Sequence, residues 1–231
     1  MLGDLDPNLW PYTRWWCNDD AVLLVYHRFG VPVLVSFGPA EAARLILDEM
    51  PCEPVLYLHV SPDVQDLLQK HYEVAAPLPM IRMSLRSAET RLIEDTGTTR
   101  LDSEDADAVE QLYCDGANRG EAPNFFLREM IDTGIYYGVR EGGRLIAVAG
   151  THFVTARGSA AAIGNVYTRH DQRRRGLAAR CTSAVASALI DAGIGTIALS
   201  VGEDNAAAIL IYQRLGFREH CRFVEGVARL R

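Results

Sequence analysis

One segment constrains the fold of this chain more than any other: VYTRHDQRRRGLAARC, residues 166–181. It begins with β-branched and aromatic residues, and small and apolar residues at helical spacing follow its glycine, so it predicts a strand, a tight turn and a helix. The first N–H groups of a helix have no partner within it and point outward along its dipole. Gly176 has no Cβ and lets a ligand come close to the backbone. The segment therefore indicates an anion-binding site at the start of a helix.

Two common phosphate-binding patterns do not describe this segment. It lacks the glycine spacing of GxGxxG, and it lacks the Lys and Ser/Thr of GxxxxGK[ST]. Its arginines suggest an alternative function, which is nucleic-acid binding through Arg173–Arg175 and Arg180. However, Lys70 is the only lysine among 23 basic residues, and residues 96–231 carry 16 basic and 16 acidic side chains. Because the chain shows neither a basic stripe nor interleaved aromatic residues, we expect no nucleic-acid partner.

The order of predicted elements divides the chain into two domains, residues 1–95 and residues 96–231. The first is a small α/β unit without a glycine-rich phosphate loop, and the polar segment around Gly97 marks the boundary. In the first domain we expect strands at 21–29, 31–37, 53–60 and 77–85 and helices at 39–50 and 61–72. In the second we expect a strand and a helix within 98–116, helices at 124–134, 174–193 and 205–217, and strands at 135–141, 144–155, 159–168, 196–201 and 221–230.

Two motifs of the second domain resemble those of a known family. Arg173, Gly176 and Ala178 fill the three positions of [R/Q]xxGx[G/A], which is motif A of the GNAT superfamily of N-acetyltransferases. About thirty residues later, NAAAILIYQRLGF is similar to motif B, with Asn205, Tyr212, Gly216 and Phe217 in register. The resemblance implies a mixed α/β (α+β) fold: a mostly antiparallel central sheet flanked by helices. The N-terminal unit resembles a degenerate GNAT-like half, as in tandem or glycine N-acyltransferase-like members.

The resemblance implies acetyl-CoA as cosubstrate. The backbone of Val166, Tyr167 and Thr168 is expected to pair with the pantetheine arm like an added strand. The remaining cofactor contacts implied are Arg173, Arg174, Arg175, Gly176, Leu177, Ala178 and Ala179 around the pyrophosphate, and Asn205, which also suits a helix N-cap. Arg174 stands where the family commonly has glycine, and His170–Asp171 replaces the usual Pro-Glu.

Acetyl transfer needs an acid for the departing thiolate and a base for the amine. Tyr212 matches the tyrosine that many members place near the thiol, and a phenol can protonate a thiolate. Many family members carry a glutamate on the strand before motif A, whereas the strand at 159–168 here has no carboxylate. The base candidates are therefore Glu203 and His152, with a water relay as a third route. An N–H of Val166 or Tyr167 can stabilise the oxyanion.

Composition limits the remaining partners. The five cysteines are scattered without a CxxC pair, which predicts free thiols and no metal site. Residues 1–95 carry 7 basic and 14 acidic side chains, which suits a cationic amine acceptor and equally a solvated surface. The N-terminus resembles no signal peptide and no apolar run is long enough for a bilayer, so we expect a cytoplasmic protein without a membrane partner. We expect the tryptophan-rich N-terminus to be an arm that packs on the body through its aromatic residues, with a substrate lid or a homodimer contact as the alternatives.

The function predicted is acetyl-CoA-dependent transfer of an acetyl group to a primary amine. A non-catalytic CoA-binding regulator or scaffold is the alternative, because the expected strand carboxylate is missing.

Overall fold

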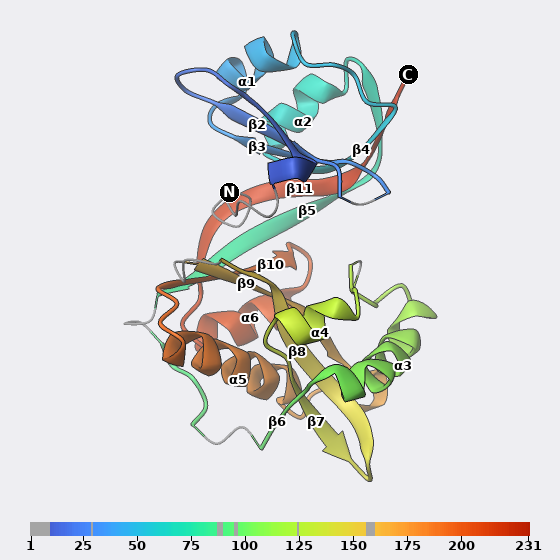
Figure 1. The fold of residues 1–231 in the computed structure, drawn as a ribbon, viewed down its shortest axis with the longest axis vertical. Helices are drawn as coiled ribbons and strands as arrows, with labels where there is room; N and C mark the ends of the chain where they lie inside the picture. Colours follow the sequence, from blue (N-terminus) through green and yellow to red (C-terminus); the bar gives the residue numbers. More distant parts are fainter. Residues whose placement is uncertain (1–9, 29, 87–89, 95–96, 124, 156–159) are drawn as a thin grey trace.

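The computed structural model describes residues 10–28, 30–86, 90–94, 97–123, 125–155 and 160–231. These residues form one 11-stranded sheet in the order β1-β2-β3-β4-β11-β5-β10-β9-β8-β7-β6, with helices packed on its faces (Figure 1). Most neighbouring strands are antiparallel, and the pairs β3–β4 and β9–β10 are parallel. The expected mixed, mostly antiparallel sheet flanked by helices is confirmed.

Strands β1–β4 and helices α1 and α2 make up what we call the N-terminal lobe. Their bounds are Thr13–Cys17 (β1), Val22–Tyr26 (β2), Val33–Phe37 (β3), Ala40–Leu47 (α1), Val55–Val60 (β4) and Pro62–Leu68 (α2). Ser61 caps α2 by accepting a hydrogen bond from the Val64 amide, as its position before Pro62 predicts. The lobe closes over an apolar core that includes Leu23, Leu34 and Leu58.

The elements between residues 99 and 214 make up the C-terminal lobe. Their bounds are Thr99–Arg100 (β6), Ala106–Ala117 (α3), Glu129–Thr133 (α4), Tyr137–Glu141 (β7), Arg144–Val154 (β8), Ala160–Thr168 (β9), Leu177–Asp191 (α5), Thr196–Gly202 (β10) and Ala206–Arg214 (α6). Helix α4 is shorter than the helix expected at 124–134, and Phe125 and Phe126 precede it in a loop.

Helices cover both faces of the C-terminal sheet. On one side, here called the α5 face, Met83, Ile163, Leu199 and Val185 pack in a core with α5 and α6. On the other, here called the α3 face, α3 packs over β8 and β9 through residues such as Val109. Side chains alternate between the two faces along each strand, so a residue next to a core residue of the α5 face belongs to the α3 face.

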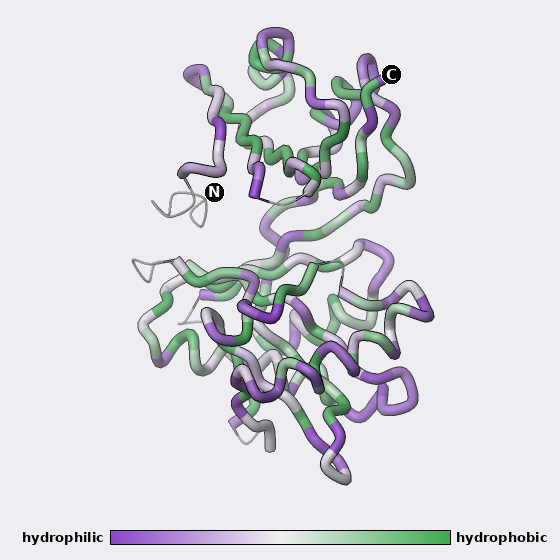
Figure 2. Tube along the Cα trace, turned by 45° about the vertical axis from the view of Figure 1, so that its right-hand side comes forward, coloured by the Kyte–Doolittle hydropathy of each residue, from purple (hydrophilic) through white to green (hydrophobic). Residues whose placement is uncertain are grey.

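Two long strands run through both lobes. β5 (Tyr72–Arg86) and β11 (Arg218–Leu230) pair antiparallel from Arg218↔Ser84 to Leu230↔Tyr72, and β11 also pairs with β4. Figure 1 shows them crossing from one lobe to the other, and Figure 2 shows that the trace between the lobes carries both hydrophobic and hydrophilic residues. The sheet therefore contains strands from both of the predicted domains, and the division into two folding units stays a prediction.

The aromatic N-terminus is only partly packed. Trp15 and Trp16 lie in the edge strand β1, and Trp16 packs against the N-terminal core. Trp10 is 56% exposed, so the expectation of an arm held by burial of its tryptophans is wrong for this residue.

Candidate active site

Strands β9 and β10 separate partway along their length, and we call this separation the splay. They are paired from Thr196↔Ala160 to Leu199↔Ile163, yet β9 continues to Thr168 and β10 to Gly202. On its far side β9 stays paired with β8 as far as Thr168↔Ala147. β10 therefore supplies no strand partner to residues 164–168, and this edge can pair with an extended ligand.

Two β-bulges face each other beside this splay. The register of β8 and β9 shifts around Asn165 on one strand and around His152 on the other. Asn165 adopts a left-handed conformation with φ +54°. Bulges re-aim side chains, and here the His152 Nε2 and the Asn165 Oδ1 lie 3.2 Å apart. Gly164 makes room for the imidazole, because a Cβ there would lie 2.2 Å from His152 Nε2.

Asn165 is the centre of a buried polar network that the sequence analysis missed. It is 4% exposed, and its side-chain amide donates to the Tyr136 hydroxyl at 2.8 Å. Its carbonyl accepts from the Tyr113 hydroxyl at 2.8 Å. Buried polar groups need such partners, so the network fixes the bulge. The Gly-Asn pair inside a strand pattern was the available signal, because an isolated glycine in a strand often marks a bulge.

Residues 173–176, here called the glycine corner, lie between β9 and α5. Gly176 is the N-cap of α5, has φ +74°, and would bring an added Cβ within 4 Å of no other atom. Residues 173–176 are exposed. Within the described residues no backbone carbonyl accepts from the amides of 174–179, and the first turn of α5 holds no acidic side chain. The corner therefore keeps the features that an anion site at a helix N-terminus requires.

The arginines of the corner have different surroundings. Arg173 donates to both carboxylate oxygens of Glu121, at 3.1 and 2.5 Å, and to the Thr168 carbonyl at 3.3 Å. This contact lowers the pKa of the Glu121 carboxyl. Arg175 is ion-paired with Glu141 at 2.9 Å. Arg174 is exposed with φ +63°, a left-handed conformation that favours glycine.

Thr168 carries the polar atom that best fits a missing partner. Its Oγ1 is buried and has no hydrogen-bond partner, and Thr168 is the last residue of β9. An unsatisfied buried hydroxyl costs about 1–3 kcal/mol. A pantetheine amide along this edge would be a suitable partner. Thr182 Oγ1, within α5, is the second such atom among the described residues.

Tyr212 lies on α6, whose N-cap is Asn205 as expected: the Asn205 Oδ1 accepts from the Ala208 amide at 3.1 Å. Tyr212 is 7% exposed and its ring packs edge-on against Phe217, with 6.0 Å between centroids. It belongs to the core that contains Val201 of β10. Burial raises the pKa of Tyr212 to about 12, so the phenol keeps its proton throughout the neutral range.

The two base candidates have different environments. Glu203 follows β10, is exposed, and is ion-paired with Arg222. His152 stands beside the splay, where its ring lies 6.3 Å from that of Phe125. Desolvation by its surroundings lowers the pKa of His152, although the side chain keeps contact with solvent. A histidine that is neutral at pH 7 can accept a proton.

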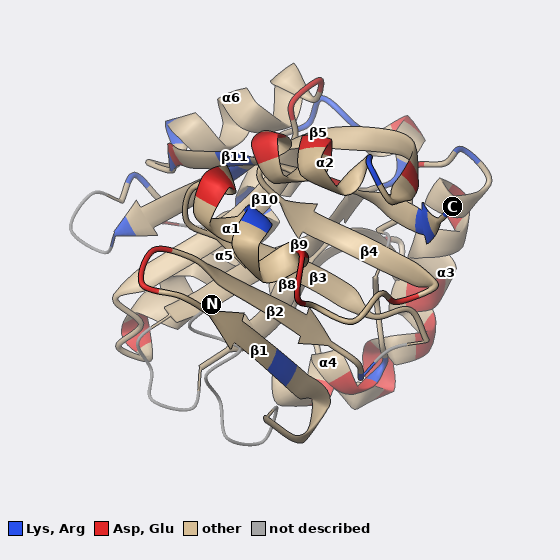
Figure 3. Cartoon of the chain, turned by 90° about the horizontal axis from the view of Figure 1, so that it is seen from above, with Lys and Arg blue, Asp and Glu red and all other residues tan. Residues whose placement is uncertain are grey.

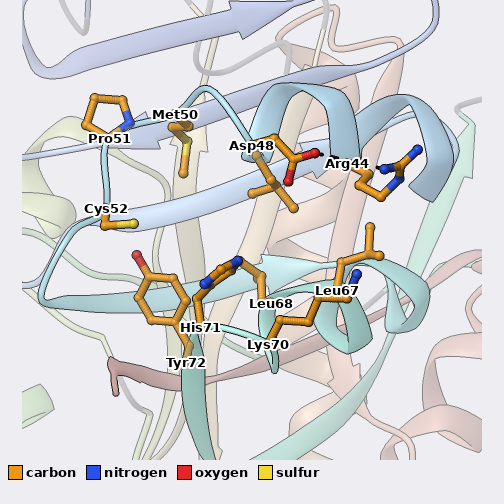
Figure 4. Close-up of a pocket in the computed structure, with 11 residues that line it drawn as sticks. Arg44, Asp48, Met50, Pro51, Cys52, Leu67, Leu68, Lys70, His71 and Tyr72 are labelled. Atoms are coloured by element: carbon orange, nitrogen blue, oxygen red, sulfur yellow. Dashed lines mark ion pairs between the residues drawn. The ribbon is translucent and has the colours of Figure 1, made fainter.

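A separate small cavity lies in the N-terminal lobe (Figure 4). Its volume is about 40 Å³, and its lining includes Asp48, Met50, Cys52 and His71. It has room for a water molecule or two and not for a nucleotide cofactor. Within the residues the structure describes, no group of three or more His, Cys, Asp or Glu side chains could hold a metal ion. None of the helices in this described part is both long and apolar enough to cross a membrane.

Comparison with known proteins agrees with this geometry. Residues 104–217 match the model of the acetyltransferase (GNAT) family. No curated protein matches the chain. Among solved structures, a putative GNAT-family acetyltransferase from Novosphingobium aromaticivorans is 20% identical, with a TM-score of 0.68 over 100% of this chain and 96% of its own. A GCN5-related N-acetyltransferase from Kribbella flavida is 18% identical, with a TM-score of 0.67 over 96% and 91%.

A tandem GNAT protein from the clavulanic acid biosynthesis pathway is 14% identical, with a TM-score of 0.56 over 95% of this chain and 84% of its own. At these identities the likeness is one of fold, and it extends over both lobes. The family match covers the splay, the glycine corner and α6. The chain therefore carries a GNAT acetyltransferase domain, and the protein is an acyltransferase. Members of this family generally use acetyl-CoA as cosubstrate.

Proposed function

We propose that this protein is an N-acetyltransferase that moves the acetyl group of acetyl-CoA directly to a primary amine. The observation that carries the proposal is the combination of the β9–β10 splay with the unpartnered amides at the start of α5. Together they offer a strand edge for pantetheine and an anion site for pyrophosphate.

The cofactor contacts are proposed along a continuous stretch of backbone. Val166–Thr168 pair with the pantetheine arm, and the free Thr168 hydroxyl supports this role. The amides of Arg174–Ala179 bind the pyrophosphate. The contact of Arg173 with Glu121 holds the end of β9 against the loop after α3, so Arg173 orients the corner. Asn205 acts first as the cap of α6, and its contact with the cofactor remains a proposal.

The chemistry is assigned to two side chains and one backbone amide. His152 accepts the proton that the amine loses as the new C–N bond forms, while an N–H of Val166 or Tyr167 stabilises the oxyanion. Tyr212 donates its proton to sulfur as the C–S bond breaks. We favour His152 over Glu203 because His152 lies at the splay, whereas the Glu203 carboxylate is already neutralised by Arg222.

Calorimetric titration of acetyl-CoA tests the cofactor site. We expect saturable heat with the unaltered protein and an affinity about 10- to 100-fold weaker in Gly176→Val, because the added side chain lies over charged hydrogen bonds worth about 1.5–3 kcal/mol in all. Gly193→Val is the matched control: Gly193 follows the C-cap residue of α5, has φ +83°, and also has open space around a Cβ.

Both variants should lose similar folding stability, since both place a β-branched residue in a left-handed conformation. Equal acetyl-CoA affinity in the two variants would contradict the proposed site. Thiol release with a panel of amines then separates an enzyme from a CoA-binding scaffold, which would bind acetyl-CoA and turn over no amine.

A further inference from the structure

One part of the α3 face, beside the splay, carries side chains to which the proposed chemistry gives no role. Leu199 and Val201 of β10 and Ile81 and Met83 of β5 pack into the core of the α5 face. Because strand residues alternate, Ser200 and Arg82 lie on the α3 face. Ser200 is exposed and Arg82 is half-buried. The sheet is thus accessible here from the α3 face, whereas α5 and α6 cover its other face.

Arg82 lies at the level of the sheet where β9 and β10 begin to separate. It is paired with Ser200 of β10, and Ser200 directly follows Leu199, the last β10 residue paired with β9. Adjacent strands are about 4.8 Å apart, so a group held by Arg82 lies one strand away from the edge proposed for the cofactor.

The guanidinium of Arg82 is held in place and has no polar partner. Its Cζ lies 4.4 Å from the centroid of the Phe223 ring, and Phe223 is 5% exposed. In the part of the chain that the structure describes, no hydrogen bond or ion pair involves the Arg82 side chain. A guanidinium has five N–H donors, and leaving them unpaired away from bulk water is unfavourable. A stacked arginine in this state is prepared to bind an anion.

Glu225, whose pKa is affected by the charge of Arg82, already has two polar partners. Glu225 Oε2 accepts from the Tyr57 hydroxyl at 3.0 Å, and Glu225 Oε1 lies 3.4 Å from His59 Nε2. Burial raises the pKa of Glu225, and the charge of Arg82 offsets part of this rise. Burial also lowers the pKa of His59 to about 4, and the charge of Arg82 lowers it further. Arg82 makes no ion pair with Glu225, so its positive charge stays available to a ligand.

We infer that the acceptor carries a carboxylate close to its amine, and that Arg82 binds this carboxylate while the amine faces the splay. The inference rests on the proposed function, and it names the class of acceptor that this function would use. A planar carboxylate matches the paired donors of a guanidinium. The single-strand distance between Arg82 and the splay favours a short amino carboxylate over a long one.

The acidic excess of the N-terminal lobe does not oppose this assignment. Figure 3 shows Asp and Glu positions on α1 and α2, which Figure 1 places at the end of the molecule away from the C-terminal lobe. Arg82 places a positive charge on the open part of the α3 face beside the splay, whereas the Glu225 carboxylate is held by Tyr57 and His59. We therefore expect an acceptor with an anionic group in place of a purely cationic one.

Steady-state kinetics with matched acceptors test the inference. Each pair consists of an amino acid and the amine it yields on loss of its carboxylate, such as alanine with ethylamine and phenylalanine with phenethylamine. We expect the unaltered enzyme to prefer the amino acid by about 10- to 100-fold in kcat/KM, the range for a hydrogen-bonded charged pair. Arg82→Gln should remove this preference and leave the KM for acetyl-CoA unchanged.

Two further variants serve as controls. Arg86→Gln removes an exposed arginine from the same face of β5, away from the splay, and should keep the preference. Arg82→Lys retains the charge without the planar fork and should recover part of the preference, which a purely structural role of Arg82 would not produce. If Arg82→Gln does not fold, Arg82→Lys takes its place in the kinetic comparison.

The inference is overturned by an enzyme that acetylates both members of each pair equally, or by an Arg82→Gln variant that keeps the preference. Absence of acetyl-CoA heat in the calorimeter, or of turnover with every amine, would count against the proposed function itself. The two failures are therefore distinguishable.

Discussion

The described part of the chain contains two parallel strand–helix–strand units, β3–α1–β4 and β9–α5–β10, and each has a glycine just before its helix. In the first unit the strands stay together: they pair through Val35↔His59, and the Ser61 amide then donates to the Ser36 Oγ at 3.3 Å. In the second unit they separate after Leu199↔Ile163. We therefore call β3–α1–β4 the closed unit and β9–α5–β10 the open unit.

The two glycines show the same contrast. Gly38, before α1, has φ +96°, and an added Cβ would lie 2.2 Å from the carbonyl oxygen of Asp20. Pro39, which cannot donate a backbone hydrogen bond, follows it, and Glu41 occupies the first turn of α1. Gly176 has open space around it and no acidic residue in the first turn of α5. One glycine therefore serves packing, and the other leaves a surface free for a ligand.

The largest effect should come from the closed unit. Gly38→Val forces a side chain into the Asp20 backbone and a β-branched residue into φ +96°, and we expect it to lower the free energy of unfolding by about 3–5 kcal/mol. Chemical denaturation measures this loss. Among molecules that still fold, acetyl-CoA affinity should be unchanged, which is the reverse of the pattern expected for Gly176→Val. Loss of affinity without loss of stability would invalidate the contrast.

A second, smaller effect should come from the helix beside the open unit. Tyr212→Phe removes the proposed acid, and we expect kcat to fall about 100-fold, or about 2.7 kcal/mol, with the KM for acetyl-CoA unchanged. Since the pKa of Tyr212 is raised to about 12, the unaltered enzyme should not lose activity through this phenol until the pH approaches that value. A pH–rate profile of kcat measures both points, and full turnover by the variant would remove the acid assignment.

The smallest effect concerns the strain stored in the open corner. Arg174→Gly should raise the free energy of unfolding by about 1 kcal/mol, because glycine adopts φ +63° without the steric cost that arginine has there. Thermal unfolding detects such a change. Arg175→Gly is the control: Arg175 has no positive φ and loses its contact with Glu141, so that variant should be less stable than the unaltered protein. Destabilisation by Arg174→Gly would show that the arginine side chain supports the corner.

Local patterns predicted the local structure well. The N-caps Ser61 and Asn205 depend on residues close in sequence, and the structure confirms them. The β8 and β9 bulges were missed, because they depend on how two strands are paired. The length of β5 was underestimated, since its first part is held by β11, which lies more than 130 residues away in the sequence.

The sequence by itself determined the strand–glycine–helix segment and the second motif around Tyr212, because both are written in residues that are neighbours along the chain. Only the tertiary structure decided where β9 and β10 part, that Asn165 and His152 meet, and that Arg82 stacks on Phe223 beside the splay. These arrangements depend on strand order and register. Both arise from packing between residues far apart in the sequence, so no short segment of the sequence predicts them.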